Sequence, residues 1–485
     1  MGAESCRLIS VTIDGLMSTQ ELHRFPTPVI KDSRERRCWD FPAITSSIIE
    51  ALTKAAISGP YKSIAVDTWG LDFGLIDRDG KIIGLPVSHR DHRTDGYLKK
   101  ASAKIGRDRL HSLSGCQLLE VNSIYQLIAI AQQSPDELEM AAHLQLMPDL
   151  VLYALTGVIG SEYTITSTSG IYDISNNCWS EELIAAFDLP RRIFGTVEDA
   201  GSVRGTLKKE LQALTGIGEL ICIATASHDT ASAVVATPLS SPGSAYISSG
   251  TWSLLGVELD KPVINKLTLN HRLTNEGGYG RSIRLLRNVM GLWLIQEVRR
   301  DLRARGEEFT YAQLVNLAIA QPDPWRTLIY VDAPVFMHAD GMIARIQNYA
   351  RKTNQSVPET PGEVAQCIFA SLALQYAQSC DVLQKCSGLP MPTIHIVGGG
   401  SQNQHLSQLT ADVSGREVIT GPTEATAMGN AIVQAIASGE IASIEEGREL
   451  VKKSLPDSKS FKPTKMKNLQ QLRERYRSLT TKEQP

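Results

Sequence analysis

The stretch SAYISSGTWSLLGVEL (residues 244–259) decides how this sequence is organised. It predicts a short apolar strand, a tight Ser-Gly-Thr turn and a second strand. Its second half, GTWSLLGVEL (250–259), has a counterpart in GAESCRLISVTI (2–13), where a glycine-led turn with hydroxyl groups again runs into an apolar strand. This repetition indicates two related halves. The first strand, SAYIS, has no counterpart before Gly2, so one strand of ~5–6 residues is expected to be missing there.

Two further types of segment combine strands with turns and helices. SIAVDTWGLDFGLIDRDGKIIGLPV (63–87) predicts a buried strand, a polar loop and a hairpin that turns at Asp79-Gly80. LICIATASHDTASAVVA (220–236) and PTIHIVGGGSQNQHLSQLTADVSG (392–415) each predict a strand followed by a turn and a helix. The chain is therefore expected to be an α/β protein whose sheets are covered by helices.

Length and composition restrict the class of protein. The 485 residues are enough for two or more cores, and 49 basic against 52 acidic residues favour neither nucleic acid nor a membrane as partner. The first residues lack a signal-peptide pattern, and no segment is apolar over the length of a bilayer. Eight cysteines are scattered singly. We expect a soluble, cytoplasmic protein with reduced thiols and a small-molecule ligand; no pattern specifies an oligomeric state.

The domain boundaries follow from the repeated turn, because no block of proline, serine or glycine separates the halves. An N-terminal domain is predicted at residues 1–217, a C-terminal domain at 218–445 and a helical tail at 446–485. Within the tail, residues 466–477 predict a basic amphipathic helix that packs on the protein surface.

Three glycine turns could each hold phosphate groups. At residues 248–251 the glycine lets backbone N–H groups approach an anion and Thr251 adds a hydroxyl donor, although an ordinary hairpin explains the same residues. Residues 2–7 form a similar turn that ends in the guanidinium of Arg7. The glycines at 398–400 join a strand to a helix, which fits nucleotide binding or tight packing. None of the turns has the dinucleotide-binding or P-loop pattern, which argues against those two classes of enzyme.

Acidic side chains at strand ends are the candidates for catalysis. Asp229 could accept the proton of an attacking hydroxyl or cap the helix that follows it. Asp67 could orient sugar hydroxyls or cap its own turn, and Trp69 offers an apolar face to a deoxy-sugar methyl group. The two histidines of HRDHR (89–93) lack a third close ligand, so no metal-binding residue is predicted.

Seven strings along the chain together resemble the FGGY carbohydrate kinases: VDTWGLDFGLID, HRDHRTDG, ASHDTASAVVA, AYISSGTWSLLG, RNVMGLWLIQE, HIVGGGSQN and GPTEATAMGNA. The resemblance extends from Gly2 to about Tyr476, and DTWG, SHDTASAV and NVMGLW together are similar to the branch that phosphorylates L-rhamnulose at its 1-hydroxyl. It implies two ribonuclease-H-like, actin-like domains with ATP, Mg²⁺ and sugar in a cleft between them. L-Fuculose or another ketose is the alternative substrate.

The resemblance also implies roles for single residues. It makes Asp229 the proton acceptor, and Asn288, opening a helix NVMGLWLIQEV, a sugar contact. Asp67 and Trp69 are added to the sugar site for the chemical reasons above. The other implied sugar-binding residues are Gly70, His228 and Thr230, and the implied ATP-binding residues are Ala3, Glu4, Ser5, Cys6, Arg7, Thr251, Gln296 and Gly399.

The chain departs from the family pattern at its first turn. In the family a strand ends in an Asp before the glycine, D-x-G-A-x-S-x-R, and that Asp helps organise magnesium and phosphates; Met1 stands where the residue after it would be. Cys6 also replaces a usual glycine. A start codon assigned too late fits these differences, and so does a non-catalytic actin-like relative that binds nucleotide or sugar. In either case unpaired backbone groups are expected to lower the stability of the chain as written.

Overall fold

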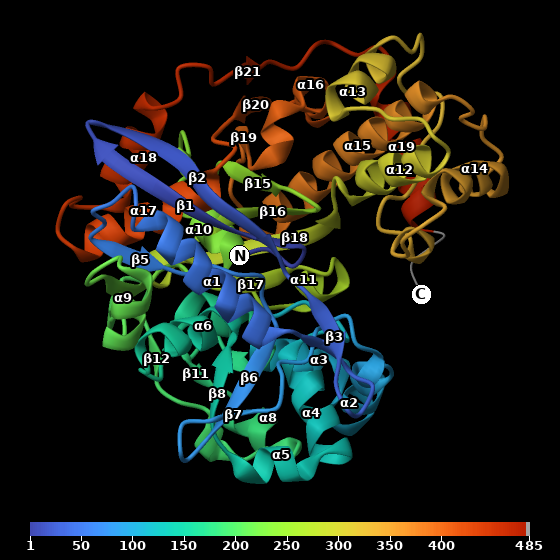
Figure 1. The fold of residues 1–485 in the computed structure, drawn as a ribbon. Coiled ribbons are helices and arrows are strands. Elements are labelled where there is room, and N and C mark those ends of the chain that lie inside the picture. Colours follow the sequence, from blue (N-terminus) through green and yellow to red (C-terminus); the bar gives the residue numbers. More distant parts are fainter. Residues whose placement is uncertain (482–485) are drawn as a thin grey trace. The chain divides into compact units, whose positions relative to one another are not determined.

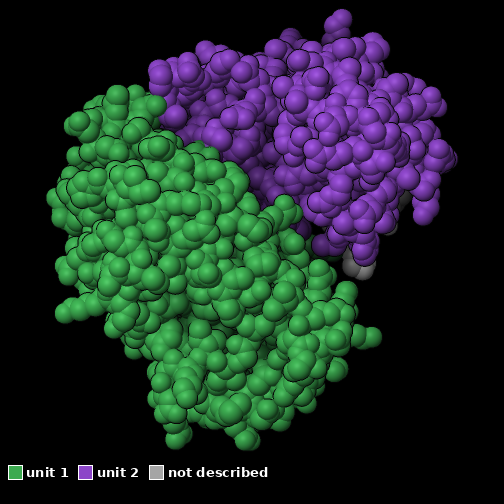
Figure 2. Space-filling view, in the orientation of Figure 1, with its two compact units in different colours: residues 1–236, 258–285, 424–454 green, residues 237–257, 286–423, 455–485 purple. Residues whose placement is uncertain are grey.

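The computed structural model describes residues 1–481 and divides into two compact units (Figures 1 and 2). Unit 1 comprises residues 1–236, 258–285 and 424–454, and the remaining segments form unit 2. The domain boundary expected near residue 218 therefore lies inside unit 1, and the expected tail is shared between the units. The first difference arises because the strand at 221–224 pairs with the strand at 63–65, and the second because a late helix and the residues after it return to unit 1.

That helix is α17 (Ala425–Ala437), which packs closely on α10 (Asp229–Val235). The approach needs a glycine, because a Cβ at Gly429 would overlap the carbonyl of Ser232. Small residues on both helices thus join segments about two hundred residues apart in the sequence.

Unit 1 is built on small sheets covered by helices. β5 (Ser63–Ala65) and β14 (Ile221–Ala224) run parallel, and β14 also pairs with β13 (Ser202–Thr206). β1 (Ser5–Asp14) and β2 (Leu16–Pro26) form a separate antiparallel hairpin. The other elements of unit 1 are β3 (Val29–Lys31), β4 (Arg37–Trp39), α1 (Phe41–Ala55), β6 (Phe73–Asp77), β7 (Ile82–Ile83), α2 (Tyr97–Ile105), α3 (Arg107–Ser114), α4 (Ser123–Gln133), α5 (Pro135–Met140), β8 (Ala141–Leu146), α6 (Met147–Thr156), β9 (Ser161–Glu162), α7 (Tyr163–Thr166), β10 (Tyr172–Asp173), β11 (Cys178–Trp179), α8 (Glu181–Ala186), β12 (Val197–Glu198), α9 (Lys209–Thr215), α11 (Lys266–Asn270), β17 (Thr274–Gly277) and α18 (Ile444–Lys453).

The sheets of unit 1 are packed against its helices by apolar clusters of different size. A large apolar cluster packs α1 and α6 against β5 and β14, with Leu52, Leu150 and Cys222 among its buried members. By contrast, the β1–β2 hairpin is fixed to α1 by a small buried cluster of Cys6, Phe25 and Ala51. The hairpin is therefore the less firmly held part of this unit.

Unit 2 contains most of a seven-stranded sheet, and the strands in this unit follow the order β18-β16-β15-β19-β20-β21. β15 is antiparallel to β16 and parallel to β19, which is parallel to β20, so the predicted strand-turn-strand and strand-glycine-helix segments are confirmed. The elements of this unit are β15 (Ala245–Ser249), β16 (Trp252–Leu259), β18 (Ile283–Met290), α12 (Trp293–Ala304), α13 (Tyr311–Ile319), α14 (Met342–Lys352), α15 (Pro361–Ser387), β19 (Thr393–Val397), α16 (Gln404–Ser414), β20 (Glu417–Thr420), β21 (Ser460–Phe461) and α19 (Leu469–Thr481), with the chain crossing between units within β16 and β18.

One predicted element is wrong. Asn288 does not open a helix but lies within β18, and α12 begins only at Trp293, after Gly291. The first part of the apolar run that suggested a helix is a strand and pairs with β16. Strand pairing between distant segments here overrides the local propensity for helix.

The predicted C-terminal helix is confirmed as α19, whose buried Leu472 and Tyr476 belong to a face that packs near α15. Across the described residues, no helix combines the length and apolar character needed to cross a membrane. All eight cysteines are free thiols.

Candidate active site

The loops that follow β5 and β14 lie side by side in unit 1. Thr68 and His228 form a parallel bridge, in which the Thr68 N–H donates to the Ser227 carbonyl at 2.9 Å and the Asp229 N–H donates to the Thr68 carbonyl at 2.9 Å. Because the carboxyl ends of adjacent parallel strands meet at one edge, this pairing brings the predicted residues Asp67–Gly70 next to His228–Thr230.

Asp229 occupies the first turn of α10, one residue after the capping position, which is taken by His228. Its Oδ1 accepts hydrogen bonds from the Thr230 backbone N–H at 2.6 Å and from the Thr230 hydroxyl at 3.2 Å. The side chain is 39% exposed and lines a cavity of about 730 Å³. The carboxylate is thus held by its neighbour while remaining open to a ligand.

A cluster of buried ionisable side chains contacts Asp229 through His228. His228 Nε2 lies 3.5 Å from Asp229 Oδ1, and His228 Nδ1 lies 3.3 Å from Glu276 Oε2. The fully buried Arg284 places Nη2 3.0 Å from His228 Nδ1 and 3.2 Å from Glu276 Oε2. Burial opposes ionisation of Glu276, but its hydrogen bond with His228 and the charge of Arg284 hold its pKa below the usual range.

Sequence reasoning missed Glu276 and Arg284. The only local sign is the charge of Arg284 inside the apolar run IRLLRNVM, because the strand that carries Glu276, TNEG, is not apolar. Such residues are rarely buried unless they are paired, but the partner cannot be read from the same segment.

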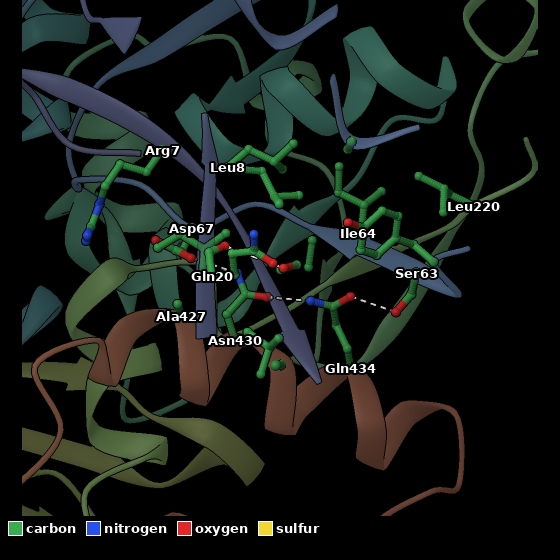
Figure 3. A pocket seen from close by; sticks show the side chains of 18 of the residues that line it. Arg7, Leu8, Gln20, Ser63, Ile64, Asp67, Leu220, Ala427, Asn430 and Gln434 are labelled. Carbon is green, nitrogen blue, oxygen red and sulfur yellow. Dashed lines mark hydrogen bonds between the residues drawn. The ribbon is translucent and has the colours of Figure 1, made fainter. Parts of the chain in front are cut away.

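Asp67 lines the same cavity. Its Oδ2 accepts a hydrogen bond from Asn430 Nδ2 at 2.6 Å, and the Met1 ammonium donates to its carbonyl at 2.6 Å. Asn430 Oδ1 in turn accepts from Gln434 Nε2, and Gln434 Oε1 accepts from Ser63, both at 2.7 Å, so a chain of polar side chains runs along α17 (Figure 3). Asp67 is therefore oriented by this chain rather than by a cap of its own turn.

Trp69 is 8% exposed and its ring lies 4.6 Å from that of Trp39. Both indole N–H groups donate to Asp72 Oδ2, at 2.9 and 2.7 Å, and His89 Nδ1 lies 2.8 Å from the same oxygen. Burial opposes ionisation of Asp72, yet His89 and the indoles keep its pKa low. Asp72 therefore fixes both indoles and His89, and the sequence did not single it out.

Gly70 is closely packed against Thr168: a Cβ at this glycine would stand 2.9 Å from Thr168 Oγ1.

In the polar loop at 89–93, Asp91 caps a short helical turn by accepting a hydrogen bond from the Arg93 N–H. Among residues 1–481 no group of three or more His, Cys, Asp or Glu side chains is arranged to hold a metal ion.

The side chains of the first turn, Ala3–Arg7, differ in their exposure to solvent. Cys6 is completely buried with its sulfur 3.3 Å from Thr27 Oγ1, and burial raises the pKa of its thiol. Thr27 also donates to the Gly2 carbonyl at 2.7 Å, which fixes the turn. Arg7 Nη1 lies 2.7 Å from Glu424 Oε1. Cys6 can therefore offer only its backbone to a ligand, whereas Glu4 is exposed, Ala3 and Ser5 are partly exposed and Arg7 is accessible.

In unit 2 the turn between β15 and β16 is joined to the start of α12. The Leu292 N–H donates to the Gly250 carbonyl at 3.0 Å and the Trp293 N–H to the Thr251 carbonyl at 3.1 Å. The Thr251 hydroxyl then donates to Gln296 Oε1 at 3.3 Å. Two residues predicted to bind ATP are thus in direct contact.

The triple glycine combines packing with open space. A Cβ at Gly398 would lie 3.0 Å from the Ser249 carbonyl, and one at Gly400 would overlap the Ser249 hydroxyl, whereas one at Gly399 would have no neighbour within 4 Å. The two outer glycines therefore serve packing, and Gly399 faces room for a ligand. The half-buried Asn288 also belongs to unit 2.

Comparison with known proteins agrees with this fold. Residues 1–236 match the N-terminal domain and residues 245–438 the C-terminal domain of the FGGY family of carbohydrate kinases. The chain belongs to this family. In solved structures, it resembles xylulose kinase from Lactobacillus acidophilus (TM-score 0.80, 16% identity, 99% of this chain and 95% of the other). It also resembles Plasmodium falciparum glycerol kinase with ADP (TM-score 0.77, 14% identity, 99% and 98%).

Relatives with higher sequence identity carry a more specific name than the family. A rhamnulokinase of Oceanobacillus iheyensis is 38% identical over 94% of this chain and 95% of its own length. A rhamnulokinase of Bacteroides thetaiotaomicron is likewise 38% identical, over 96% and 95%.

Proposed function

We propose that this chain is a rhamnulokinase, which transfers the γ-phosphoryl group of ATP to the 1-hydroxyl of L-rhamnulose. The observation that carries the proposal is the placement of Asp229, an accessible carboxylate supported by a buried His-Glu-Arg cluster at the end of two parallel strands. The names of the full-length relatives support the choice of sugar.

In the proposed reaction the sugar oxygen forms a bond to the γ-phosphorus while the bond from that phosphorus to the β–γ bridging oxygen breaks, leaving ADP. Asp229 accepts the proton of the attacking hydroxyl. His228 and Glu276 keep that carboxylate in place, and Asp67 orients the sugar hydroxyls. Positioning of this kind accounts for most of the rate in phosphoryl transfer.

ATP and Mg²⁺ are the implied cofactors. The open face of Gly399 and the Thr251–Gln296 pair fit a nucleotide, because they combine room with hydrogen-bonding groups. The carboxylate of Asp67, which lines the cavity, fits Mg²⁺, a cation usually held by one or two carboxylates together with substrate phosphates. When bound, Mg²⁺ would neutralise charge on the transferred group.

The test is Asp229→Asn. Asparagine keeps the oxygen that accepts from Thr230 but takes up no proton, so we expect kcat on L-rhamnulose to fall ~10²–10⁴-fold with little change in melting temperature. Asp108→Asn, a change at an exposed Asp in the first turn of α3, is the matched control and should leave kcat unchanged. Turnover of the Asp229 variant within a factor of a few of its parent would refute the assignment, and faster turnover of L-fuculose by the parent would refute the choice of sugar.

A further inference from the structure

A short buried segment of unit 1, residues 162–168, is rich in hydroxyl groups. It contains the capping residue of α7, the helix itself and the first residues of the turn after it. Its sequence is EYTITST, and none of its residues is more than 4% exposed. Buried polar side chains cost free energy unless they form hydrogen bonds, so the partners of these groups indicate what the segment holds in place.

Three of these hydroxyl groups accept hydrogen bonds from the backbone of three separate parts of unit 1. With the donor first, the pairs are Leu71 N–H to Thr168 Oγ1 at 3.3 Å, Gly277 N–H to Ser167 Oγ at 2.7 Å and His228 N–H to Thr164 Oγ1 at 3.2 Å. The three donors lie directly beside Gly70, Glu276 and Asp229 in the sequence. Residues 162–168 are therefore a common support for three parts of the candidate site.

The support is most extensive at the residues before Asp229. Glu162 Oε2 accepts from the Ser227 N–H at 3.2 Å and from the Thr164 hydroxyl at 2.7 Å. Because this hydroxyl has one proton and donates it to Glu162, its lone pairs are left to accept from the His228 N–H. The Asp229 N–H donates to the neighbouring loop, as described above, so three consecutive N–H groups are held in place.

The position of the Asp229 carboxylate depends on this backbone. Its side chain is 39% exposed, and Thr230, the next residue, donates hydrogen bonds to it. Those two bonds move with the loop and do not fix its place in unit 1. Displacement of a reacting group by ~1 Å can lower a rate ~10²-fold. The contacts that anchor the loop should therefore affect turnover.

We propose that Glu162 and Thr164 are positioning residues for Asp229. They act through the two N–H groups that precede it in the chain, those of Ser227 and His228. Neither positioning residue lines the cavity that Asp229 lines, so their effect on turnover passes through the loop. This inference rests on the proposed function, because it concerns the support of the proposed proton acceptor.

The test compares Thr164→Val, Thr164→Ser and Thr166→Val in the full chain. Valine nearly keeps the shape of threonine but lacks the hydroxyl, whereas serine keeps the hydroxyl. Thr166 is the matched control, because it is equally buried in the same helix and its hydroxyl has no hydrogen-bond partner within residues 1–481. Burial raises the pKa of Glu162 to about 7, so the assays are run at about pH 8, where its carboxylate accepts from Thr164.

The expected effect of Thr164→Val is on kcat. We expect kcat to fall ~10-fold or more while the KM for sugar changes less than ~2-fold, because the displaced loop carries the proton acceptor. Thr164→Ser and Thr166→Val should stay within ~2-fold of the parent in both constants. Amide hydrogen exchange in a peptide covering residues 226–232, measured by mass spectrometry, should be ~10-fold faster in Thr164→Val alone.

The two measurements separate this inference from the proposed function. Exchange needs no substrate, so it still decides whether Thr164 anchors the loop if the parent proves inactive on L-rhamnulose. Equal exchange in Thr164→Val and Thr166→Val would overturn the proposal, and so would an unchanged kcat of Thr164→Val on a sugar that the parent phosphorylates. An equal loss of kcat in Thr164→Ser would show that packing, and not the hydroxyl, is responsible, and would overturn it as well.

Discussion

Glu276 and Arg284 illustrate how buried charged side chains can help to position an accessible carboxylate, that of Asp229. Neither residue contacts the cavity, yet the two hold His228, which lies against Asp229. Removal of one member of a buried ion pair leaves the other without a partner, which typically costs ~3–5 kcal/mol.

Glu276→Gln is therefore expected to lower the free energy of unfolding by ~3 kcal/mol near neutral pH. Because folding lowers the pKa of Glu276, its contribution is present above the ordinary value of 4.5 and is lost as pH falls through the lowered pKa of the folded state. The difference between parent and variant should thus shrink as pH falls below 4.5. Urea unfolding of both proteins as a function of pH measures it, and a difference that is constant with pH would contradict the assignment.

The three glycines at 398–400 permit a separate test. Gly399→Val adds a side chain where a Cβ has no neighbour within 4 Å, so we expect unchanged stability but a KM for ATP raised ~10-fold or more, equal to ~1.4 kcal/mol. Gly400→Ala should instead destabilise the chain by ~1–3 kcal/mol, because its Cβ meets Ser249. Kinetics and thermal melts separate the two effects. If only the KM for sugar changed in Gly399→Val, the assignment of Gly399 to the ATP site would be refuted.

At the scale of elements, the sequence predicted best where one segment contains its own pattern. The hairpin at 244–259 and the helix after the triple glycine were predictable because strand, turn glycine and helix start follow one another directly. Asn288 was misplaced because only pairing with a distant strand makes its segment extended. For the same reason the sequence proposed Asp229 as a candidate but did not single out Glu276, whose contacts depend on partners from other segments.

The C-terminal helix α19 is predicted to contribute to folding and not only to cover a surface. Tyr476 is buried and donates its hydroxyl to Gln375 Oε1 at 3.0 Å. Tyr476→Ala should cost ~3–5 kcal/mol, and Tyr476→Phe only ~1 kcal/mol, since it removes one hydrogen bond. Glu474→Ala, on the exposed face, should change stability by less than ~0.5 kcal/mol. Chemical denaturation of the three variants checks this, and equal effects of Ala at both positions would contradict it.

At the scale of the whole molecule, the thiols report on the integrity of the fold. Cys178 is exposed and Cys386 is partly exposed, while the other six cysteines are buried. Burial also raises the pKa of Cys116 to about 12, which suppresses its reactive thiolate. A thiol reagent should label Cys178 first and Cys386 more slowly, and the remaining six only after unfolding. Mass spectrometry of the labelled chain identifies the sites, and rapid native labelling of Cys116 would show that the described packing is incorrect.

The segmented composition of unit 1 has a consequence for synthesis on the ribosome. Domains commonly fold in order as they emerge, the N-terminal one first. Here α10 lacks its closely packed neighbour until α17 has been translated, after most of unit 2. The nascent N-terminal half therefore leaves one face of α10 uncovered, and a ribosome stalled before residue 424 would carry a chain in which the helix that begins at Asp229 still lacks its packing partner.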